Sequence, residues 1–198
     1  MEIKDTYIEV NQHLVDGCRK NKRSAQIRIY ELYYKAMYNT SLRILNNREE
    51  AEDIMQEAFL DAFKKIDLYK GTGSFGAWLK RIVVNKSIDH LRTKKETLSL
   101  EEEIIAAEDV EDTSLEDETY VNNTFTRMEE IRNALENLPN HHKIVVSLYL
   151  LEGYDHKEIA QILNISYNNA RARYFRAKKE LLKEIIKSGE AYLKSLTN

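Results

Sequence analysis

The stretch that decides the fold spans residues 154–178 and reads YDHKEIAQILNISYNNARARYFRAK. Asp155 is a natural N-cap, and Glu158 stands three residues further on, which is the spacing of a capping box. The apolar residues expected on the inner face of this first helix are Ile159, Ala160, Ile162 and Leu163. Asn164 follows, and asparagine enters the left-handed region more readily than most residues, so the chain can turn here without glycine. Because Ser166 can then cap a second helix, the stretch predicts two helices joined by a tight turn.

The second helix of this stretch is basic and carries two amide side chains near its start. In a helix-turn-helix, residues near the start of the second helix reach base edges in the major groove. Arginine can pair with guanine, asparagine with adenine, and an apolar ring can contact a thymine methyl group. The candidate contacts are Asn168, Asn169, Arg171, Arg173, Phe175, Arg176, Lys178 and Lys179. The alternative is a packed helical hairpin whose basic face is only solvated.

The charge of the chain is distributed unevenly. The 198 residues carry a formal net charge of −3, from 30 Lys and Arg against 33 Asp and Glu. Residues 96–119 contain eleven acids and no Lys or Arg, so the rest of the chain has 30 basic and 22 acidic residues and a charge of +8. This pattern indicates two basic, polyanion-binding parts joined by an acidic linker. The linker has few aromatic residues, so we expect a disordered tether, a segment that occupies a basic groove of a partner, or both.

Composition favours a helical protein of a reducing compartment. Pro139 is the only proline, six glycines are spread thinly, and 42% of the residues are apolar, which suffices for a core. Cys18 is the only cysteine, so no internal disulfide can form, and we expect it to be a small buried residue. The N-terminus lacks a signal peptide and no apolar run approaches the length of a membrane span, so a cytoplasmic protein without membrane insertion is expected. The five histidines lack metal-ligand spacing, so neither a metal nor a cofactor is expected.

Three helices are expected before the linker, over residues 24–46, 48–66 and 75–95. The apolar positions of the first, at three- and four-residue steps, are Ile27, Tyr30, Tyr34, Met37, Tyr38, Leu42 and Leu45. The second has a continuous apolar stripe, and its opposite face holds Asp53, Gln56, Glu57, Leu60 and Lys64. Leu60 stands alone on this polar face, either as an ordinary exposed leucine or as the centre of a protein-contact patch.

A glycine-containing loop, residues 67–75, separates the second helix from the third. It lacks the Gly-Lys-Ser/Thr ending of a nucleotide-binding loop, so ATP binding is excluded, and Ser74 can cap the helix that follows. The third helix has apolar residues on two sides, as expected in the middle of a small bundle, with Trp78 as a core anchor. Between these two surfaces lie Arg81, Asn85, Asp89 and Arg92. They form either local ion pairs or a polar ridge for nucleic acid.

Two further helices are expected between the linker and the helix-turn-helix. The apolar positions of the first are Met128, Ile131, Ala134, Leu135 and Leu138. Pro139 ends that helix, since proline cannot continue it. The second helix begins at His141, and its apolar positions are Val145, Val146, Leu148 and Leu151. Gly153 ends it, and the histidines are expected to be surface or capping groups.

Four stretches together resemble a known family. They are AEDIMQEAF, GSFGAWLKRIVVNKSIDHLR, LENLP and EIAQILNISYNNARARYFRAKKEL, in that order and with the acidic linker between them. On these stretches the chain closely resembles bacterial RNA polymerase sigma factors of the extracytoplasmic-function group, over residues 24–186. The resemblance implies an all-α protein of two small helical domains joined by an acidic flexible linker. Residues 1–95 would be sigma region 2, residues 96–127 the linker, and residues 128–198 region 4 with the helix-turn-helix.

The resemblance also implies roles for individual residues. Core RNA polymerase would be contacted by Asp53, Gln56, Glu57 and Leu60. The unwound minus-ten element would be bound by Tyr69, Lys70, Thr72, Ser74, Phe75, Arg81, Asn85, Asp89 and Arg92. There a base can be read once it is flipped out of the duplex and held by the loop. The minus-thirty-five duplex would be read by Ser166, Asn168, Asn169, Arg171, Arg173, Phe175 and Arg176. The linker would thread the RNA path of the polymerase, and an anti-sigma factor is an expected further partner besides promoter DNA.

The chain departs from the family pattern near the start of the recognition helix. The family often has Gly-Thr-Val where this chain has Asn168, Asn169 and Ala170, and it often has Ser in place of Ala172. We therefore expect these four positions to set the promoter preference. Two rival functions are a helix-turn-helix regulator that works without polymerase and a helical adaptor whose basic helix binds an acidic protein. An enzyme is not expected, because the sequence contains no nucleophile–base pair, metal set or phosphate loop.

Overall fold

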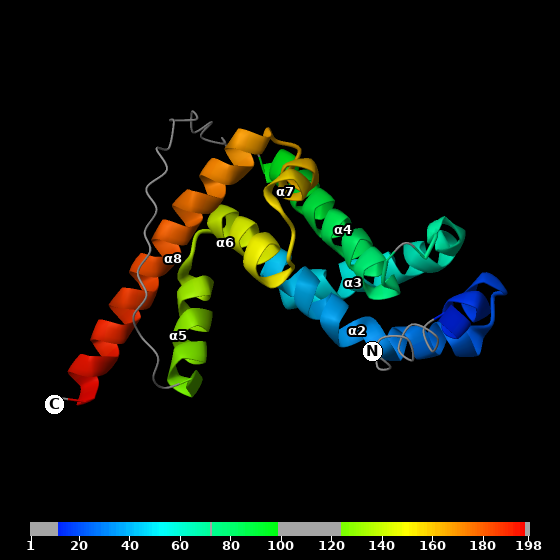
Figure 1. Cartoon of the computed structure of the whole chain (residues 1–198), viewed down its shortest axis with the longest axis horizontal. Coiled ribbons are helices and arrows are strands. Elements are labelled where there is room, and N and C mark those ends of the chain that lie inside the picture. The colour runs from blue at the N-terminus through cyan, green and yellow to red at the C-terminus, as the bar shows by residue number, and fades with distance from the viewer. Residues whose placement is uncertain (1–11, 72, 99–123, 197–198) are drawn as a thin grey trace. The chain divides into compact units, whose positions relative to one another are not determined.

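The computed structural model describes the chain over residues 12–71, 73–98 and 124–196 (Figure 1). Over these residues the secondary structure is helical, with no strand. This confirms the predicted all-α class. The acidic strip predicted to be a disordered tether, residues 96–119, lies almost entirely outside the described residues.

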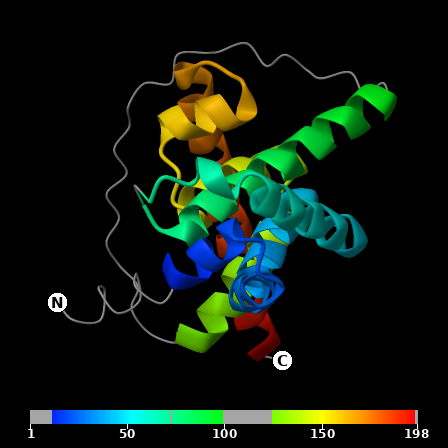
Figure 2. The ribbon, with the colours of Figure 1, turned by 90° about the vertical axis from the view of Figure 1, so that its right-hand side faces the viewer.

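The chain divides into two compact units, Met1–Glu101 and Glu102–Asn198, in agreement with the two helical domains expected from the sequence. The first unit contains a helix over residues 12–19, then α2 (Arg23–Leu45), α3 (Arg48–Lys64), the short 3-10 turn η1 (Ile66–Leu68) and α4 (Phe75–Leu98). Helices α2, α3 and α4 each contact the other two, so this unit is a small bundle. Figure 2 shows the helix of residues 12–19, in dark blue, beside the turn that leads into α4.

The core of the first unit is built from α2, α3 and α4 together. Ala51, Ala58 and Ala62 are fully buried on α3, and their small side chains let the neighbouring helices approach closely. On α4, Val83 and Val84 are both fully buried although they point to different sides of the helix. This confirms the expectation that α4 is covered from two directions.

Two adjacent asparagines separate α2 from α3. Asn46 adopts the left-handed conformation with φ 52°, and its N–H donates to the carbonyl of Leu42 at 2.8 Å, which ends α2. The side-chain oxygen of Asn47 accepts from the N–H groups of Glu49 and Glu50 at 3.0 and 3.2 Å, which starts α3. The chain therefore changes direction within two residues without glycine or proline.

The buried face of α2 differs from the stripe expected from the sequence. Ile27 and Tyr34 are 49% and 36% exposed, whereas Ile29 is buried in the core. Towards its C-terminal end, α2 buries the small polar residue Ser41, whose hydroxyl lies 3.0 Å from that of Ser87 on α4. Apolar and aromatic residues occur on more than one side of this helix, and close approach of α4 selects the side with small residues. Hydrophobic spacing therefore placed Met37 and Leu45 correctly on the buried face but wrongly included Ile27 and Tyr34.

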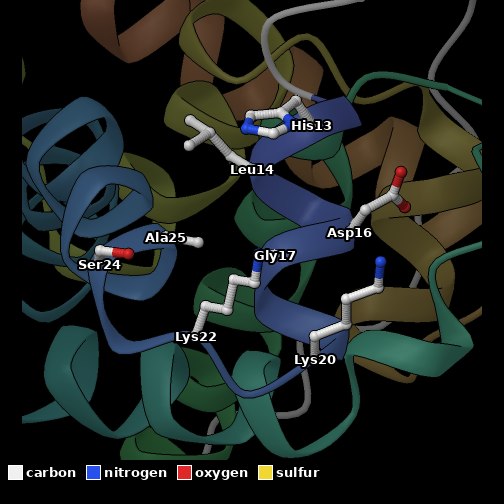
Figure 3. Close-up of a pocket in the computed structure, with 8 residues that line it drawn as sticks. All are labelled: His13, Leu14, Asp16, Gly17, Lys20, Lys22, Ser24 and Ala25. Carbon is white, nitrogen blue, oxygen red and sulfur yellow. The ribbon is translucent and has the colours of Figure 1, made fainter.

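The helix of residues 12–19 packs closely on the start of α2. A Cβ added at Gly17 would lie 2.6 Å from the Cβ of Ala25, so only glycine fits without a shift. Cys18 is buried at the same junction, as expected for a small apolar residue, and burial raises the pKa of its thiol to about 11. Figure 3 shows Ala25 pointing towards the side of the helix that carries Gly17. The depression beside this contact has a volume of about 320 Å³ and is lined by polar and apolar residues, among them His13, Leu14 and Lys20.

The second unit is organised around its last helix. It contains α5 (Thr124–Asn137), α6 (Asn140–Val146), the π-helical turn η2 (Ser147–Leu151), α7 (His156–Leu163) and α8 (Tyr167–Leu196). Helices α5, α6 and α7 all pack against α8, which is the long orange-to-red helix in Figure 1. One buried cluster joins α5, α6 and α8 through Ala134, Leu138, Val146, Ala177 and Leu181.

The helix that follows Pro139 is not α-helical to its end. The N–H of Glu152 donates to the carbonyl of Ser147, five residues earlier, at 2.9 Å, and this bond closes the wider π turn. The wider turn displaces the following side chains around the helix axis, and Leu151 is 48% exposed although its spacing predicted a buried position. Leu148, at the start of the turn, is fully buried as expected.

Candidate nucleic-acid interfaces

The first helix of the helix-turn-helix begins with the capping box expected from the sequence. The Asp155 carboxylate accepts from the N–H groups of Lys157 and Glu158 at 2.7 and 2.8 Å. In return, the Glu158 carboxylate accepts from the N–H of Asp155 at 3.0 Å. The backbone hydrogen bond from Glu158, followed by that from Lys157, lowers the pKa of Asp155. The start of α7 is therefore fixed by three hydrogen bonds, two of which form the reciprocal pair between Asp155 and Glu158.

The turn between α7 and α8 forms as predicted at Asn164. This residue adopts the left-handed conformation with φ 53° and ψ 49°. The next N–H, from Ile165, donates to the carbonyl of Ala160 at 3.0 Å, which satisfies the end of α7. The Ser166 hydroxyl accepts from the N–H of Asn169 at 3.2 Å and caps α8. Together these contacts fix the start of α8 relative to α7.

Helix α8 has a buried side and an outer side. Ala170, Tyr174 and Ala177 are buried against the other helices of the second unit. Residues with the opposite phase of the helical period, which form the outer side, are Asn168, Ala172, Phe175, Arg176 and Lys179. Because Ala170 is fully buried, we correct the expectation that this position sets promoter preference by contact.

Several predicted contact residues on α8 are paired with each other. The Arg173 Nε donates to the Asn169 side-chain oxygen at 3.1 Å. The Arg171 guanidinium lies over the Phe175 ring, 5.4 Å from its centroid. A cation above an aromatic face is held there by the quadrupole of the ring. Two pairs, Arg173 with Asn169 and Arg171 with Phe175, therefore hold these side chains in place on and beside the outer side of α8.

An aromatic cluster packs against the buried side of α8. The ring of Tyr174 lies 4.2 Å from that of Tyr149 on η2 and 5.2 Å from the His156 imidazole at the start of α7. Burial and the nearby Arg171 guanidinium lower the pKa of His156. His156 is thus partly buried, and not the simple surface or capping group expected from the sequence. The cluster fixes the N-terminal half of α8 because rings from three elements meet on it.

In the first unit, the predicted ridge on α4 is at the surface. Arg81, Asn85 and Asp89 are exposed, and Arg92 is partly exposed. Arg92 Nη1 lies 2.9 Å from Asp89 Oδ1, so the local ion pair that was one of the two alternatives is present at this end of the ridge. The Asp89 side chain is 69% exposed, so this pair lies at the surface.

The loop before α4 is closed by its own tyrosine. We call residues 69–74 the glycine loop, and the predicted contact Thr72 lies outside the described residues. The Tyr69 hydroxyl donates to the carbonyl of Gly73 at 2.6 Å, and Gly71 has a positive φ of 73° that favours glycine. The Ser74 hydroxyl accepts from the N–H of Ala77 at 3.2 Å, which confirms its predicted capping role.

Two residues predicted to contact the minus-ten element lie in the core. Phe75 is 2% exposed and Tyr69 is 8% exposed, and their rings are in edge contact with centroids 5.4 Å apart. Both also contact Trp78, which is the predicted core anchor. We therefore correct their role from side-chain contact with DNA to support of the glycine loop. Lys70 and Ser74 remain exposed on it.

The four residues predicted to contact polymerase form one exposed stripe on α3. Asp53, Gln56, Glu57 and Leu60 follow one another at three-, one- and three-residue steps, and Leu60 is 59% exposed. Lys86 on α4, which the sequence did not single out, lies 3.2 Å from Glu57 Oε2. Because these two residues are distant in the sequence, no local pattern could have predicted the pair.

The described part of the chain gives two negative results. It has no helix with an apolar stretch long enough to cross a bilayer. Within the same residues, no group of three or more His, Cys, Asp or Glu side chains is arranged to hold a metal ion.

The geometry of the second unit defines a helix-turn-helix protein of the DNA-binding class. Two family models match the chain: Sigma-70 region 2 over residues 29–97, and Sigma-70, region 4 over residues 128–181. The chain is 30% identical over 174 residues to the ECF RNA polymerase sigma factor SigW of Bacillus subtilis, a match that covers 84% of this chain and 92% of that protein. It is 25% identical over 184 residues to the RNA polymerase sigma-H factor of Pseudomonas aeruginosa, covering 89% and 94% of the two chains.

Among solved structures, the fold is similar to that of the sigma factor RpoE of Bartonella quintana, crystallised with the anti-sigma factor NepR. The TM-score is 0.52 at 19% identity, and the match covers 81% of this chain and 95% of that one. The chain belongs to the extracytoplasmic-function family of RNA polymerase sigma factors, as the resemblance of its motifs implied. It is therefore a factor for promoter-specific transcription initiation and not an enzyme.

Proposed function

We propose that this sigma factor reads the minus-thirty-five element of its promoters with the N-terminal half of α8. The observation that carries the proposal is the outer side of this helix, where Asn168, Phe175 and Arg176 lie opposite the buried alanines. The capping box and Asn164 support it, because they hold the start of α8 in the orientation that a recognition helix needs. Arg176 would pair with a guanine and Asn168 with an adenine, while the Arg171–Phe175 pair would contact a thymine methyl or a phosphate.

We propose that the first unit binds the separated strands of the minus-ten element. The glycine loop would hold one unstacked base, with Lys70 on the neighbouring phosphate. The ridge of Arg81, Asn85 and Asp89 would contact the strand next to it. The exposure of this ridge and the closure of the loop by Tyr69 support the proposal. Reading separated strands is physically favourable, since base edges that are hidden in the duplex become available.

The exposed stripe on α3 is proposed as the contact with core RNA polymerase. Leu60 would fill an apolar pocket of the polymerase, and the surrounding polar residues Asp53, Gln56 and Glu57 would form the rim. The pair with Lys86 would hold Glu57 in place before binding. The acidic linker would then follow the RNA path of the polymerase, where its charge resembles that of RNA.

Two further points belong to this proposal. An anti-sigma factor is a fitting regulator, because the similar structure of the Bartonella quintana sigma factor contains one. Action together with RNA polymerase would take place in the cytoplasm. We also propose domain boundaries at residues 1–95, 96–127 and 128–198, and the family matches at residues 29–97 and 128–181 support this division.

The proposal is tested by transcription in a purified system. Core RNA polymerase plus this protein should produce transcripts that begin at specific promoters. The promoters that are transcribed should have a minus-ten and a minus-thirty-five element in common. Tight binding to free duplex DNA without stimulation of polymerase would instead support the regulator that works alone. Binding to neither would support the helical adaptor.

A further inference from the structure

We propose that Arg19, on the helix of residues 12–19, is a positioning residue that holds the glycine loop in the shape that reads the minus-ten strand. The inference rests on the proposed function of that loop. Arg19 lies fifty residues before Tyr69 in the sequence and belongs to none of the motifs described above.

The contact between Arg19 and the loop is direct and charge-assisted. Arg19 Nη2 donates to the carbonyl oxygen of Tyr69 at 2.6 Å. Arg19 Nη1 lies 2.9 Å from Asp16 Oδ1, and the same oxygen accepts from Gln12 Nε2 at 3.1 Å. A guanidinium is planar and its donors point in fixed directions. The hydrogen bond from Nη1 to Asp16 therefore orients Nη2 towards the loop.

Tyr69 transmits this contact across the loop. Its carbonyl is held by Arg19, while its hydroxyl donates to the carbonyl of Gly73 at 2.6 Å. Its ring lies between Phe75 and Trp78, with centroids 5.4 and 5.6 Å away. Tyr69 therefore accepts the hydrogen bond from Arg19 with its backbone carbonyl, and its side-chain hydroxyl binds Gly73 at the far end of the loop. Without Arg19, the carbonyl of Tyr69 loses its charged donor and the loop loses this contact with the helix of residues 12–19.

The helix that carries Arg19 is itself firmly seated. Val15 and Cys18 are buried in the core of the first unit, and Gly17 lies against Ala25 with no room for a side chain. Arg19 thus connects a rigid part of the core to the loop, as the adjacent dark-blue helix and turn in Figure 2 indicate. A loop fixed in advance binds a flipped base without having to order first, and it rejects bases that require another shape. We therefore expect Arg19 to affect discrimination among bases more than the ability to initiate.

The test uses the full chain with core polymerase on promoters that carry each of the four bases at each minus-ten position. Arg19→Ala should lower the ratio of transcript from the best base to transcript from the other bases by about tenfold, as expected for one charge-assisted hydrogen bond. Arg19→Lys, which keeps the charge but not the two fixed donors, should lie between. Affinity for core polymerase and discrimination at the minus-thirty-five element should stay unchanged. Trp78 is the only tryptophan of the chain and adjoins Tyr69, so its fluorescence should report the loosened loop.

Two comparisons make the outcome decisive. Arg28→Ala removes the same charge from an exposed pair with Glu31 on α2, and it should leave discrimination unchanged. Gly71→Ala places a Cβ at a positive φ of 73°, a conformation that L side chains rarely adopt, so it strains the loop itself. If Gly71→Ala changes discrimination and Arg19→Ala does not, the role of Arg19 is wrong and the proposed function stands. If neither does, both are wrong. If Arg19→Ala lowers transcription equally for all bases, or if it lowers the Tm strongly, the role of Arg19 is only structural. If a well-folded Asp16→Asn variant keeps the normal ratio, Asp16 does not orient the Arg19 guanidinium.

Discussion

At the scale of single residues, Arg176 carries the most specific prediction. It lies on the outer side of α8, one turn after Ala172, where a guanidinium can reach a guanine edge. Arg176→Ala should weaken binding to the minus-thirty-five duplex by about 1–3 kcal/mol and relax preference at one base pair. Binding titrations with a set of singly substituted duplexes measure both effects. Arg132→Ala is the control, because it removes the same charge from an exposed pair with Glu136 on α5. An equal loss on every duplex would show that Arg176 contacts phosphate.

Glu50 links the stability of the first unit to pH. Its carboxylate accepts from Lys94 Nζ at 2.6 Å and lies 3.0 Å from His90 Nε2, and the hydrogen bond from Lys94 is the main cause of its lowered pKa. The folded-state pKa is thus below the ordinary value of 4.5, so the stabilisation is complete above that pH and is lost as pH falls through the lowered value. Urea unfolding across this acid range should show a flatter pH dependence for Glu50→Gln. The neighbouring exposed Glu49→Gln should keep the steep dependence of the parent protein.

At the scale of elements, the contact of the first helix with α2 requires glycine. A Cβ at position 17 would lie 2.6 Å from the Cβ of Ala25, so Gly17→Ala must push the helix of residues 12–19 away from α2. We expect a loss of about 1–3 kcal/mol in the free energy of unfolding, as for other overpacked sites. Chemical denaturation followed by Trp78 fluorescence measures this loss. The double variant with Ala25→Gly should recover most of it, and no recovery would mean that another contact opposes the added methyl group.

The α3 stripe makes a prediction about binding and not about stability. Leu60 is 59% exposed, so Leu60→Asp should leave the Tm unchanged. If Leu60 fills a pocket of the polymerase, the same change should weaken binding to core by about 2 kcal/mol or more, since a buried apolar anchor is replaced by a charge. Leu68→Asp is the matched control, because Leu68 is 65% exposed and lies on η1, outside the α3 stripe. Equal effects of the two substitutions in a core-binding assay would argue against the stripe.

At the scale of the whole molecule, the features that could be predicted from the sequence are those determined within a few residues. The capping box at Asp155, the left-handed Asn164 and the caps at Ser74 and Ser166 each depend on neighbours in the chain, and the structure confirms them. The two-sided burial of α4 follows from the positions of its apolar residues. The helices and the helix-turn-helix were therefore accessible to prediction.

What could not be predicted depends on contacts between distant segments. Arg19 reaches Tyr69, and Lys86 reaches Glu57, through the packing of helices that the sequence does not pair. The family resemblance implied that Phe75 contacts the minus-ten element, yet the rings of Tyr33, Tyr69 and Trp78 surround it. For the candidate sites, spacing identified the helices correctly, but only the packing separated the exposed candidate residues from the buried ones.

The uneven charge of the whole chain makes a final prediction. Replacing the eleven acids of residues 96–119 with the corresponding amides changes the formal net charge from −3 to +8. The replacement leaves the residues matched to region 4 and the α3 stripe unchanged. Such a chain should bind non-specific duplex DNA more tightly in the absence of polymerase, because fewer negative charges oppose the phosphates. Binding measured over a range of salt concentrations should show the gain largest at low salt and small at high salt. A variant with the same residues in shuffled order keeps the charge of −3 and should behave like the parent protein. A gain of equal size in the shuffled chain would mean that the order of the segment, and not its charge, limits binding to DNA.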